Sequence, residues 1–191
     1  MDTSTGTTKT HRAALAVLPP EPLWAPIQAF RRRHDRQHHR WPPHVNLLYP
    51  FLTPAAWTQA QARILAVCSR QAPFELTLDG PRWFEHRPHH YTLWLAPEPA
   101  EALVALHRAL REAVPQCDDL DRLPGGYTPH LSVGQARGRR ALARLLEELR
   151  RTWTPAGFRV EAVHYLTRGP RGTPEDVFRV RARLRLGGGN G

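Results

Sequence analysis

Cysteine is scarce in this sequence, and the two cysteines present do not form a recognisable site. Cys68 and Cys117 are far apart, and neither belongs to a C-x-x-C pair. A disulfide framework or a cysteine-ligated zinc site needs more cysteines at characteristic spacings. The sequence therefore excludes the small disulfide-rich proteins and the cysteine zinc proteins, and we expect a cytoplasmic protein.

Long hydrophobic runs are also missing. No apolar run approaches the roughly 20 residues that a membrane-spanning helix needs, so we expect no membrane partner. The first apolar run, 13–18, is too short for the core of a signal peptide and is followed by Pro19 and Pro20. We expect a strand there. The hydrophobic content of 41% and the six tryptophans exclude a disordered protein, and 191 residues suffice for one domain or two small lobes with a shared core.

Acidic residues are few relative to basic ones. The sequence has 17 Asp and Glu against 27 Lys and Arg, which gives a formal net charge of +10. Lys9 is the only lysine, so arginine carries nearly all of the positive charge. Because the guanidinium group presents a planar fork of donors to phosphate and basic surfaces attract polyanions, we expect RNA or a nucleotide as partner. A merely solvated basic surface, caused by genomic base composition, stays open as the alternative.

The order of the predicted elements indicates an α+β fold. We expect a disordered tail at 1–10, a single folded domain at 11–186 and a flexible glycine-rich tail at 187–191. Helical periodicity predicts helices near 22–35, after Pro54, near 98–113 and near 138–151. Alternating or apolar segments predict strands near 12–18, 44–49, 74–78, 91–95, 130–134, 157–167 and 176–186. Such mixed order favours antiparallel sheets with helices on their outer faces.

Two short segments share one pattern. Pro43-His44-Val45-Asn46-Leu47 is matched by Pro129-His130-Leu131-Ser132-Val133. In a strand, residues two apart project from the same face, so each segment presents a histidine beside a hydrogen-bonding side chain. One histidine among the 11 of this chain is a weak signal. The repetition favours a shared role, and two imidazoles can serve as acid and base in metal-free phosphoryl chemistry.

These segments resemble the signature of the two-histidine (2H) phosphoesterase superfamily, which includes 2′-5′ RNA ligases and cyclic phosphodiesterases. That signature is a duplicated His-x-Thr/Ser followed by an apolar residue, and the order of elements is similar over about 11–186. The resemblance implies a bilobal fold in which two pseudo-symmetric antiparallel sheets line a central cleft. We expect His44 and His130 to lie on central strands of these sheets. Asn46 departs from the pattern, because Thr or Ser is typical of its position.

The resemblance also implies a mechanism without cofactor or metal. Water opens a 2′,3′-cyclic phosphate while one imidazole accepts a proton and the other donates one. By resemblance, His130 is the base and His44 the acid, and these roles are exchanged when 2′-5′ ligation runs in reverse. Asn46 and Ser132 are expected to bind the non-bridging phosphate oxygens, since an amide and a hydroxyl can both donate hydrogen bonds. A structural role for Asn46, pairing with backbone at a strand edge, stays open.

Further substrate-binding candidates surround the second motif. Tyr127 precedes His130 by three residues and is a candidate base-stacking platform at the cleft rim, while Gln135 and Arg137 follow the motif and are candidates for phosphate contacts. For each of them a place in the core or on a solvated surface is the alternative. Other candidate platforms are Trp41, Trp83 and Phe84. Tyr49 faces away from His44 in an ideal strand, so we expect it in the core.

Two other functions stay open. The first is an RNA-binding module of the same fold without turnover, which the departure at Asn46 permits. The second is a metal-binding protein, because His34 and His38 are spaced as in helical zinc sites and His89-His90 lies in a predicted turn. The missing third ligand and the surrounding arginines argue against a metal. We expect a monomer.

Overall fold

The computed structural model describes residues 8–187 and contains ten strands and four α-helices in that range. The helices are α1 (Trp24–His34), preceded by a 3₁₀ turn at Glu21–Leu23, α2 (Pro54–Arg70), α3 (Glu101–Ala113) and α4 (Arg139–Thr152). The strands are β1 (Lys9–Thr10), β2 (Ala13–Val17), β3 (Val45–Leu48), β4 (Phe51–Leu52), β5 (Phe74–Arg87), β6 (His90–Glu98), β7 (Leu131–Arg137), β8 (Ala156–Val160), β9 (Ala162–Thr167) and β10 (Arg179–Arg185). Within the described range, no helix is long and apolar enough to span a bilayer.

Two four-stranded antiparallel sheets form the centre of the molecule. The first sheet has the order β10-β9-β2-β3, and the second has the order β7-β6-β5-β8. The pseudo-symmetry lies in the repeat of strand, helix and motif strand, β2-α1-β3 in one half and β6-α3-β7 in the other. The predicted α+β fold with two antiparallel sheets is therefore confirmed. The expectation that the histidine motifs lie on central strands is wrong, because β3 and β7 are each an edge strand.

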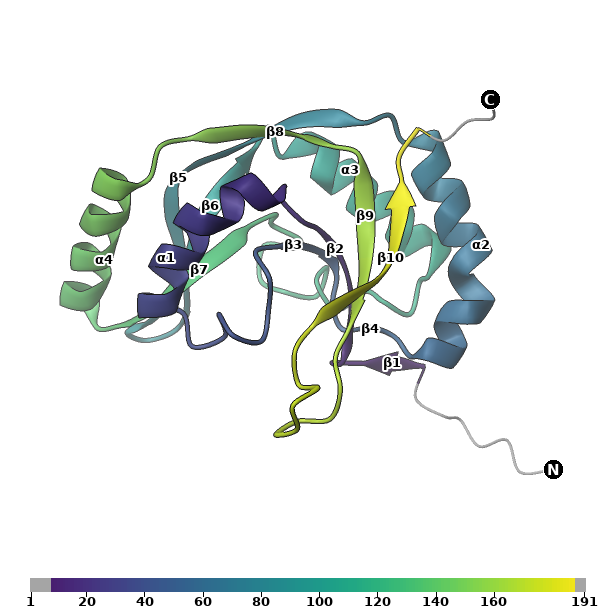
Figure 1. Ribbon diagram of the computed structural model, residues 1–191, viewed down its shortest axis with the longest axis horizontal. Helices are drawn as coiled ribbons and strands as arrows, with labels where there is room; N and C mark the ends of the chain where they lie inside the picture. Colours follow the sequence, from purple (N-terminus) through teal and green to yellow (C-terminus); the bar gives the residue numbers. More distant parts are fainter. Residues whose placement is uncertain (1–7, 188–191) are drawn as a thin grey trace.

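The helices cover the outer faces of the two sheets (Figure 1). Helices α1 and α4 pack against the second sheet, whereas α3 packs against β3 and α2 against β10 of the first sheet. Both α1 and α3 therefore cover the sheet to which the strand before them does not belong. With the helices placed in this way, β3 and β7 lie close to each other. Each is the edge strand of its sheet, and no further strand pairs with its free edge.

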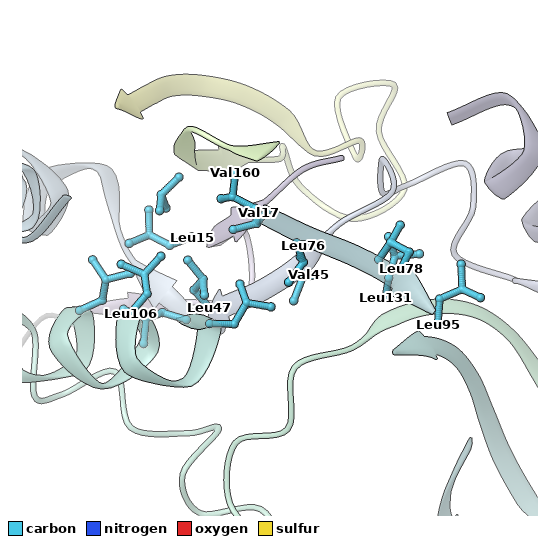
Figure 2. Close-up of a cluster of buried hydrophobic side chains, with 14 of the residues drawn as sticks. Leu15, Val17, Val45, Leu47, Leu76, Leu78, Leu95, Leu106, Leu131 and Val160 are labelled. Atoms are coloured by element: carbon cyan, nitrogen blue, oxygen red, sulfur yellow. The ribbon is translucent and has the colours of Figure 1, made fainter. Parts of the chain in front are cut away.

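One apolar core runs through both sheets. Figure 2 shows side chains from the first sheet beside side chains from the second, with Leu106 of α3 at one end. Strand β2 is buried along its whole length, which explains its uninterrupted apolar sequence. The labelled members of this cluster are Leu15, Val17, Val45, Leu47, Leu76, Leu78, Leu95, Leu106, Leu131 and Val160.

The predicted strand at 157–167 is two strands in different sheets. Strand β8 pairs with β5 of the second sheet, and β9 pairs with β2 and β10 of the first. Exposed Glu161 separates them without interrupting the alternation of buried and exposed residues. Alternation reports which face is buried and not which strand is the neighbour, so the change of sheet leaves no mark in the sequence.

The chain ends differ in part from the expectation. Lys9 and Thr10 pair with Leu52 and Phe51, so the prediction of disorder through residue 10 is wrong for these two residues. Gly187 donates a backbone hydrogen bond to the Cys68 carbonyl. The remainder of the two predicted tails, 1–7 and 188–191, lies outside the described residues.

Candidate active site

The two motif histidines have the same local geometry. His44 immediately precedes β3, and its Nδ1 lies 2.8 Å from the carbonyl oxygen of Pro42. His130 immediately precedes β7, and its Nδ1 lies 2.8 Å from the carbonyl oxygen of Thr128. Because a carbonyl can only accept, each Nδ1 must carry the proton and donate. Each Nε2 then presents its lone pair, and neither Nε2 has a hydrogen-bond partner among residues 8–187.

The surroundings of both imidazoles favour the neutral form. Burial lowers the pKa of His44 to about 3; the Pro42 carbonyl opposes this shift, while the positive charges of Arg31 and His130 add to it. Burial also lowers the pKa of His130, and His86 adds to that effect. Both rings are therefore neutral at pH 7 in the protein alone. A phosphate anion between them would act in the opposite direction, because a nearby negative charge stabilises imidazolium.

A cavity of about 540 Å³, the central cavity, lies beside the second motif. Its polar wall comes from the motif strands, the segment before β7 and the strands β5 and β6: Asn46, Tyr127, Thr128, His130, Ser132, Glu85, His86 and Thr92. Its apolar wall comes from the loop after α3 and from β5: Leu120, Leu123, Pro124 and Phe84. The volume and the two kinds of wall suit a small ligand with one polar and one apolar end.

The two predicted phosphate donors meet at this cavity. Asn46 and Ser132 are both half-buried and line it, although they come from different sheets. The Asn46 side-chain oxygen is buried and has no hydrogen-bond partner among the described residues. The side-chain oxygen is therefore not paired with backbone, as the structural alternative required.

Tyr127 connects the two motifs. Its hydroxyl donates a 2.7 Å hydrogen bond to the backbone carbonyl of Asn46, and its ring stacks on His107 at 4.0 Å between centroids. Burial raises the pKa of the phenol. His107 in turn bonds the Leu47 carbonyl at 2.7 Å and Asp121 at 2.8 Å. Tyr127 lines the cavity as predicted, but one face of its ring is already occupied.

Gln135 and Arg137 lie further along β7 and away from the central cavity. The Gln135 amide donates to Asp35 at 2.9 Å and accepts from the backbone N–H of Arg36 at 3.0 Å. Both hydrogen bonds fasten the end of α1 to β7, so Gln135 has a structural task that the sequence did not indicate. Exposed Arg137 lines a neighbouring cavity together with Gln135.

A stack of aromatic rings supports His44 from behind, and sequence reasoning missed it. The Trp41 ring lies parallel to the imidazole at 4.3 Å, and Phe178 stacks on Trp41 at 3.4 Å. Arg31, only 2% exposed, donates to the Trp41 carbonyl at 2.9 Å and pairs with Asp35 at 2.8 Å. The available signal was the position of Arg31 on the apolar face of α1, four residues before an aspartate.

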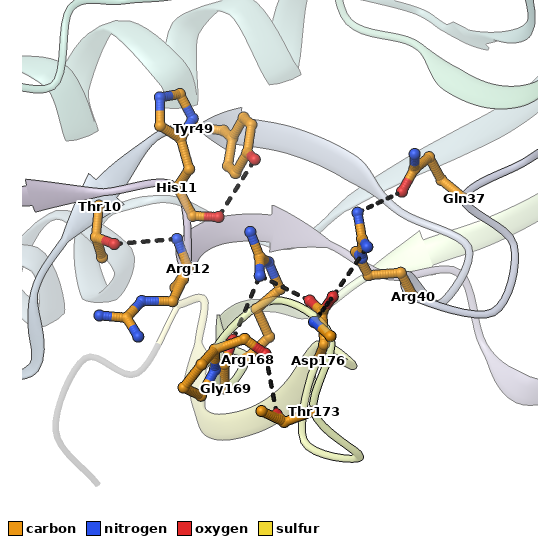
Figure 3. A network of polar contacts seen from close by, with 12 residues as sticks. Thr10, His11, Arg12, Gln37, Arg40, Tyr49, Arg168, Gly169, Thr173 and Asp176 are labelled. Atoms are coloured by element: carbon orange, nitrogen blue, oxygen red, sulfur yellow. Dashed lines mark hydrogen bonds and ion pairs between the residues drawn. The ribbon is translucent and has the colours of Figure 1, made fainter.

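The loop between β9 and β10, which leads to Phe178, is joined through Asp176 to Arg40 and Arg168 (Figure 3). Asp176 accepts hydrogen bonds from Arg168 at 2.7 Å and from Arg40 at 2.9 Å. The backbone N–H of Phe178 donates to the Arg40 carbonyl at 2.8 Å. These contacts join the loop to the segment that carries Trp41, so a carboxylate at the far end of the chain fixes the support of His44.

The other aromatic candidates fall into different places. Tyr49, predicted in the core, is half-buried and lines the central cavity, because β3 ends at Leu48 and the alternation cannot be extended to it. Phe84 also lines this cavity, with its ring 5.0 Å from that of His130. Trp83 is 47% exposed and lines no wall of the central cavity. Trp41 is committed to His44 and Phe178.

The histidine pair considered for zinc does not converge. Helix α1 ends at His34, so His34 and His38 are not one turn apart on a helix. His34 bonds Glu148 at 3.3 Å, whereas the Nδ1 of His38 bonds the Asp35 carbonyl at 2.9 Å. Across residues 8–187, no three His, Cys, Asp or Glu side chains are grouped as a metal site requires.

Comparison with protein families gives one match over most of the chain. The model of the 2′-5′ RNA ligase superfamily matches residues 19–172. Two bacterial proteins are also similar. One is named "Putative phosphoesterase GK0864" from Geobacillus kaustophilus, 22% identical over 121 residues that make up 63% of this chain and 67% of that protein. The other, a Bacillus licheniformis protein with the same first two words in its name, is 24% identical over 63% of this chain and 69% of its own.

Solved structures share the fold. TT0787 of Thermus thermophilus superimposes with a TM-score of 0.61 at 22% identity, covering 94% of this chain and all of that one. Escherichia coli LigT complexed with phosphate gives a TM-score of 0.62 at 17% identity, covering 93% of this chain and 98% of LigT. LigT has also been crystallised with 3′-AMP, and that structure gives a TM-score of 0.60. At these identities the likeness shows the arrangement of the elements alone.

Proposed function

Because the chain belongs to the 2′-5′ RNA ligase superfamily, we propose that it is a metal-independent phosphoesterase that opens 2′,3′-cyclic phosphates on RNA ends or nucleosides. One observation carries the proposal. The two motif histidines each donate from Nδ1 to a carbonyl two residues earlier, which leaves both Nε2 atoms for proton transfer. The paired geometry is what a reaction with one acid and one base requires.

The proposed reaction proceeds in line at phosphorus. Nε2 of neutral His130 accepts a proton from water while the water oxygen forms a bond to phosphorus. The bond from phosphorus to one ribose oxygen breaks, and that oxygen takes the proton from Nε2 of protonated His44. The product is a phosphate monoester beside a free ribose hydroxyl. When a hydroxyl of a second nucleotide replaces water, the same step gives 2′-5′ ligation with both histidines in the same roles. The histidines exchange roles when the 2′-5′ bond is cleaved back to the cyclic phosphate.

His130 lines the central cavity and His44 does not, and other residues that line it fit this reaction. Asn46 and Ser132 present donors from opposite sheets, where charge accumulates on the non-bridging oxygens. The anionic substrate also supplies the negative charge that His44 needs, since its pKa of about 3 leaves it neutral at pH 7 in the protein alone. The apolar wall around Leu120 and Phe84 suits a nucleobase.

The test is turnover in EDTA. We expect purified protein in EDTA to hydrolyse nucleoside 2′,3′-cyclic phosphates or cleave 2′-5′-linked dinucleotides. We expect His44→Ala and His130→Ala each to lower kcat by about 10² or more, the usual contribution of an acid or base. His39→Ala, which removes an exposed histidine outside the cavity, serves as the matched control. Activity that EDTA abolishes and zinc restores would contradict the proposal, as would full activity of either catalytic variant.

A second candidate is an RNA-binding module without turnover. Asn46 at a position typical of Thr or Ser, together with the low pKa of His44, favours it. This candidate predicts that oligoribonucleotides with a cyclic phosphate end bind to the wild type but are not turned over, and that His44→Ala binds them equally well. Measured turnover by the wild type would exclude it.

A further inference from the structure

A second cavity, the basic cavity, adjoins the central one. It has a volume of about 400 Å³ and shares His86 and Thr92 with the central cavity. Its wall contains three arginines and three histidines but no carboxylate: His34, Arg36, His86, Arg87, His90 and Arg137. A wall of this composition recognises an anion, and its position next to the candidate active site raises the question of which anion.

Strand register places part of this wall in a single row. Arg87 on β5 lies opposite His90 on β6, and His90 lies opposite Arg137 on β7. Residues directly opposite each other on neighbouring strands project from the same face. The three basic side chains therefore stand side by side across three strands, on rigid sheet and not on a loop.

Because of a bulge in β7, these three basic side chains lie on the same face of the sheet as Ser132 of the second motif. Trp94 lies opposite Ser132, but Leu93 lies opposite Gly134, so Val133 is an extra residue in β7. Without it Ser132 and Arg137 would face opposite sides, whereas with it they share a face. From Trp94 to His90 is four residues along β6, which is roughly 13 Å at about 3.3 Å per residue. The basic row therefore lies beyond the phosphate held at Ser132.

The last residue of α1, His34, and Arg36 of the segment that follows supply the opposite wall. The close approach depends on Gly134, since a Cβ there would lie 3.1 Å from Cβ of His34. The Gln135 amide then fixes the backbone of Arg36 through a 3.0 Å hydrogen bond. The structural task of Gln135 is thus to hold an arginine at the mouth of the basic cavity.

The three arginines are uncompensated. Among residues 8–187, no ion pair involves Arg36, Arg87 or Arg137, although Arg40 and Arg168 in the nearby network are paired with Asp176. Burial and then the charges of Arg87, Arg137 and Arg36 lower the pKa of His90. All three charges therefore act at one point in the cavity, and a single anion placed there interacts with all of them.

We propose that the basic cavity binds a second phosphate of the same RNA strand, so that the enzyme prefers the end of an oligonucleotide to a mononucleotide. The inference depends on the proposed function for the identity of the first phosphate. His86 and Thr92, which are hydrogen-bonded to each other at 2.9 Å, line both cavities, so the cavities adjoin, and the offset along β6 separates the two phosphates. A single nucleoside cyclic phosphate would fill the central cavity and leave the basic cavity to solvent.

Two measurements test the inference. The first is the ratio of kcat/KM for a short oligoribonucleotide with a 2′,3′-cyclic phosphate end to that for the corresponding mononucleotide. The second is the ratio of their affinities, measured with 3′-phosphate ends that do not react. We expect both ratios to fall roughly tenfold or more in Arg87→Gln/Arg137→Gln, since hydrogen bonds to charged groups are the strong ones. The dependence of oligonucleotide affinity on salt should become less steep by about 0.7 per arginine removed.

The control is Arg63→Gln, an exposed arginine on α2 that lines neither cavity. It should keep both ratios at the wild-type values. Equal ratios in the double variant and in the wild type would overturn the inference, whether or not the protein turns over substrate. If the wild type turns over neither compound but the affinity ratio falls in the double variant, the proposed function fails and the second phosphate site stands.

Discussion

Asn46 is the residue at which this chain departs from its family pattern. It lines the central cavity, and its buried side-chain oxygen has no hydrogen-bond partner among residues 8–187. A serine or threonine hydroxyl offers one donor on a short, rotatable group, whereas an amide offers two donors and an acceptor in a plane. Asn46 therefore keeps a donor for phosphate. Because a hydroxyl can accept as well as donate, the difference lies in the second donor and in the planar geometry of the amide.

The first prediction concerns Asn46 and Ser132. Removing one donor to the transition state costs roughly 10²–10³ in rate, so Asn46→Ala and Ser132→Ala should each lower kcat on a cyclic phosphate by that factor while the circular dichroism spectrum stays unchanged. Asn46→Thr should retain more activity than Asn46→Ala, because a hydroxyl can again donate. Wild-type turnover by Asn46→Ala alongside an inactive His44→Ala would assign Asn46 a structural role.

The second prediction concerns the pH dependence of kcat/KM, which reports on the free enzyme. The acid must be protonated and the base neutral, but the surroundings lower both pKa values, that of His44 to about 3. The fraction of enzyme with one imidazolium therefore grows as pH falls below 6.5. We expect kcat/KM to rise on acidification from pH 7 to pH 5, and kcat to peak at higher pH because bound phosphate raises the pKa values. A maximum of kcat/KM above pH 7 would contradict the assignment.

The sequence predicts the parts of the site that repeat. His44 and His130 stand out because each has the same neighbours, and of the four motif residues Asn46, His130 and Ser132 line one cavity. The residues behind His44 could not be found in this way. Trp41, Phe178 and Arg31 come from three separate segments and contact the site through ring stacking and one backbone carbonyl, and neither contact has a characteristic spacing.

At the scale of elements, the close packing of α1 on β7 positions residues both behind His44 and at the basic cavity. The end of α1 carries Arg31, which contacts the support of His44, and continues into Arg36 at the basic cavity. Gly134 lets the helix come this close, because any side chain at that position would meet His34. A substitution at Gly134 in β7 should therefore alter both the central cavity and the basic cavity.

The third prediction tests this approach with a matched pair. In Gly134→Ala the new Cβ would lie 3.1 Å from Cβ of His34, so the helix must shift, and we expect a loss of about 1–3 kcal/mol in the free energy of unfolding. In Gly157→Ala on β8 the nearest atom would be 3.6 Å away, an ordinary contact. That variant should unfold at or above the wild-type urea midpoint. Equal midpoints for the two variants would show that α1 adjusts without cost.

The elements themselves are predictable where periodicity decides them. The four helices and the motif strands appear near their expected positions, because apolar spacing distinguishes helix from strand. The sequence does not reveal which strands pair with one another. The bulge at Val133 and the change of sheet at Glu161 both preserve a plausible pattern of buried and exposed residues, so only three-dimensional pairing identifies them.

At the scale of the whole molecule, half-buried histidines link stability to pH. Burial and Arg183 lower the pKa of His164 to about 4, and burial also lowers the pKa values of His44 and His130. In the unfolded chain an imidazole titrates near pH 6.5. Between that value and the folded pKa, the unfolded chain binds more protons, so acidification favours unfolding.

The fourth prediction is therefore a loss of stability from pH 6.5 toward pH 4, before carboxylates titrate. Each histidine contributes a slope of at most about 1.4 kcal/mol per pH unit. Urea unfolding of wild type and His164→Leu at pH 7.5, 6 and 5 measures it, and the variant should show the weaker dependence. A wild-type free energy of unfolding that is constant over this range would contradict the shifted pKa values.

The exchange of helices between the sheets limits how such a chain can be divided. The second sheet is one continuous stretch of sequence, β5 to β8, placed between the strands of the first sheet, yet its cover α1 comes before that stretch while α3 within it covers the other sheet. A gene fragment encoding either sheet alone would thus lack one helix over its apolar face. A single crossover between the genes of two relatives would pack a sheet of one protein against a helix of the other. We therefore expect recombination to leave the fold intact only when both halves come from the same parent.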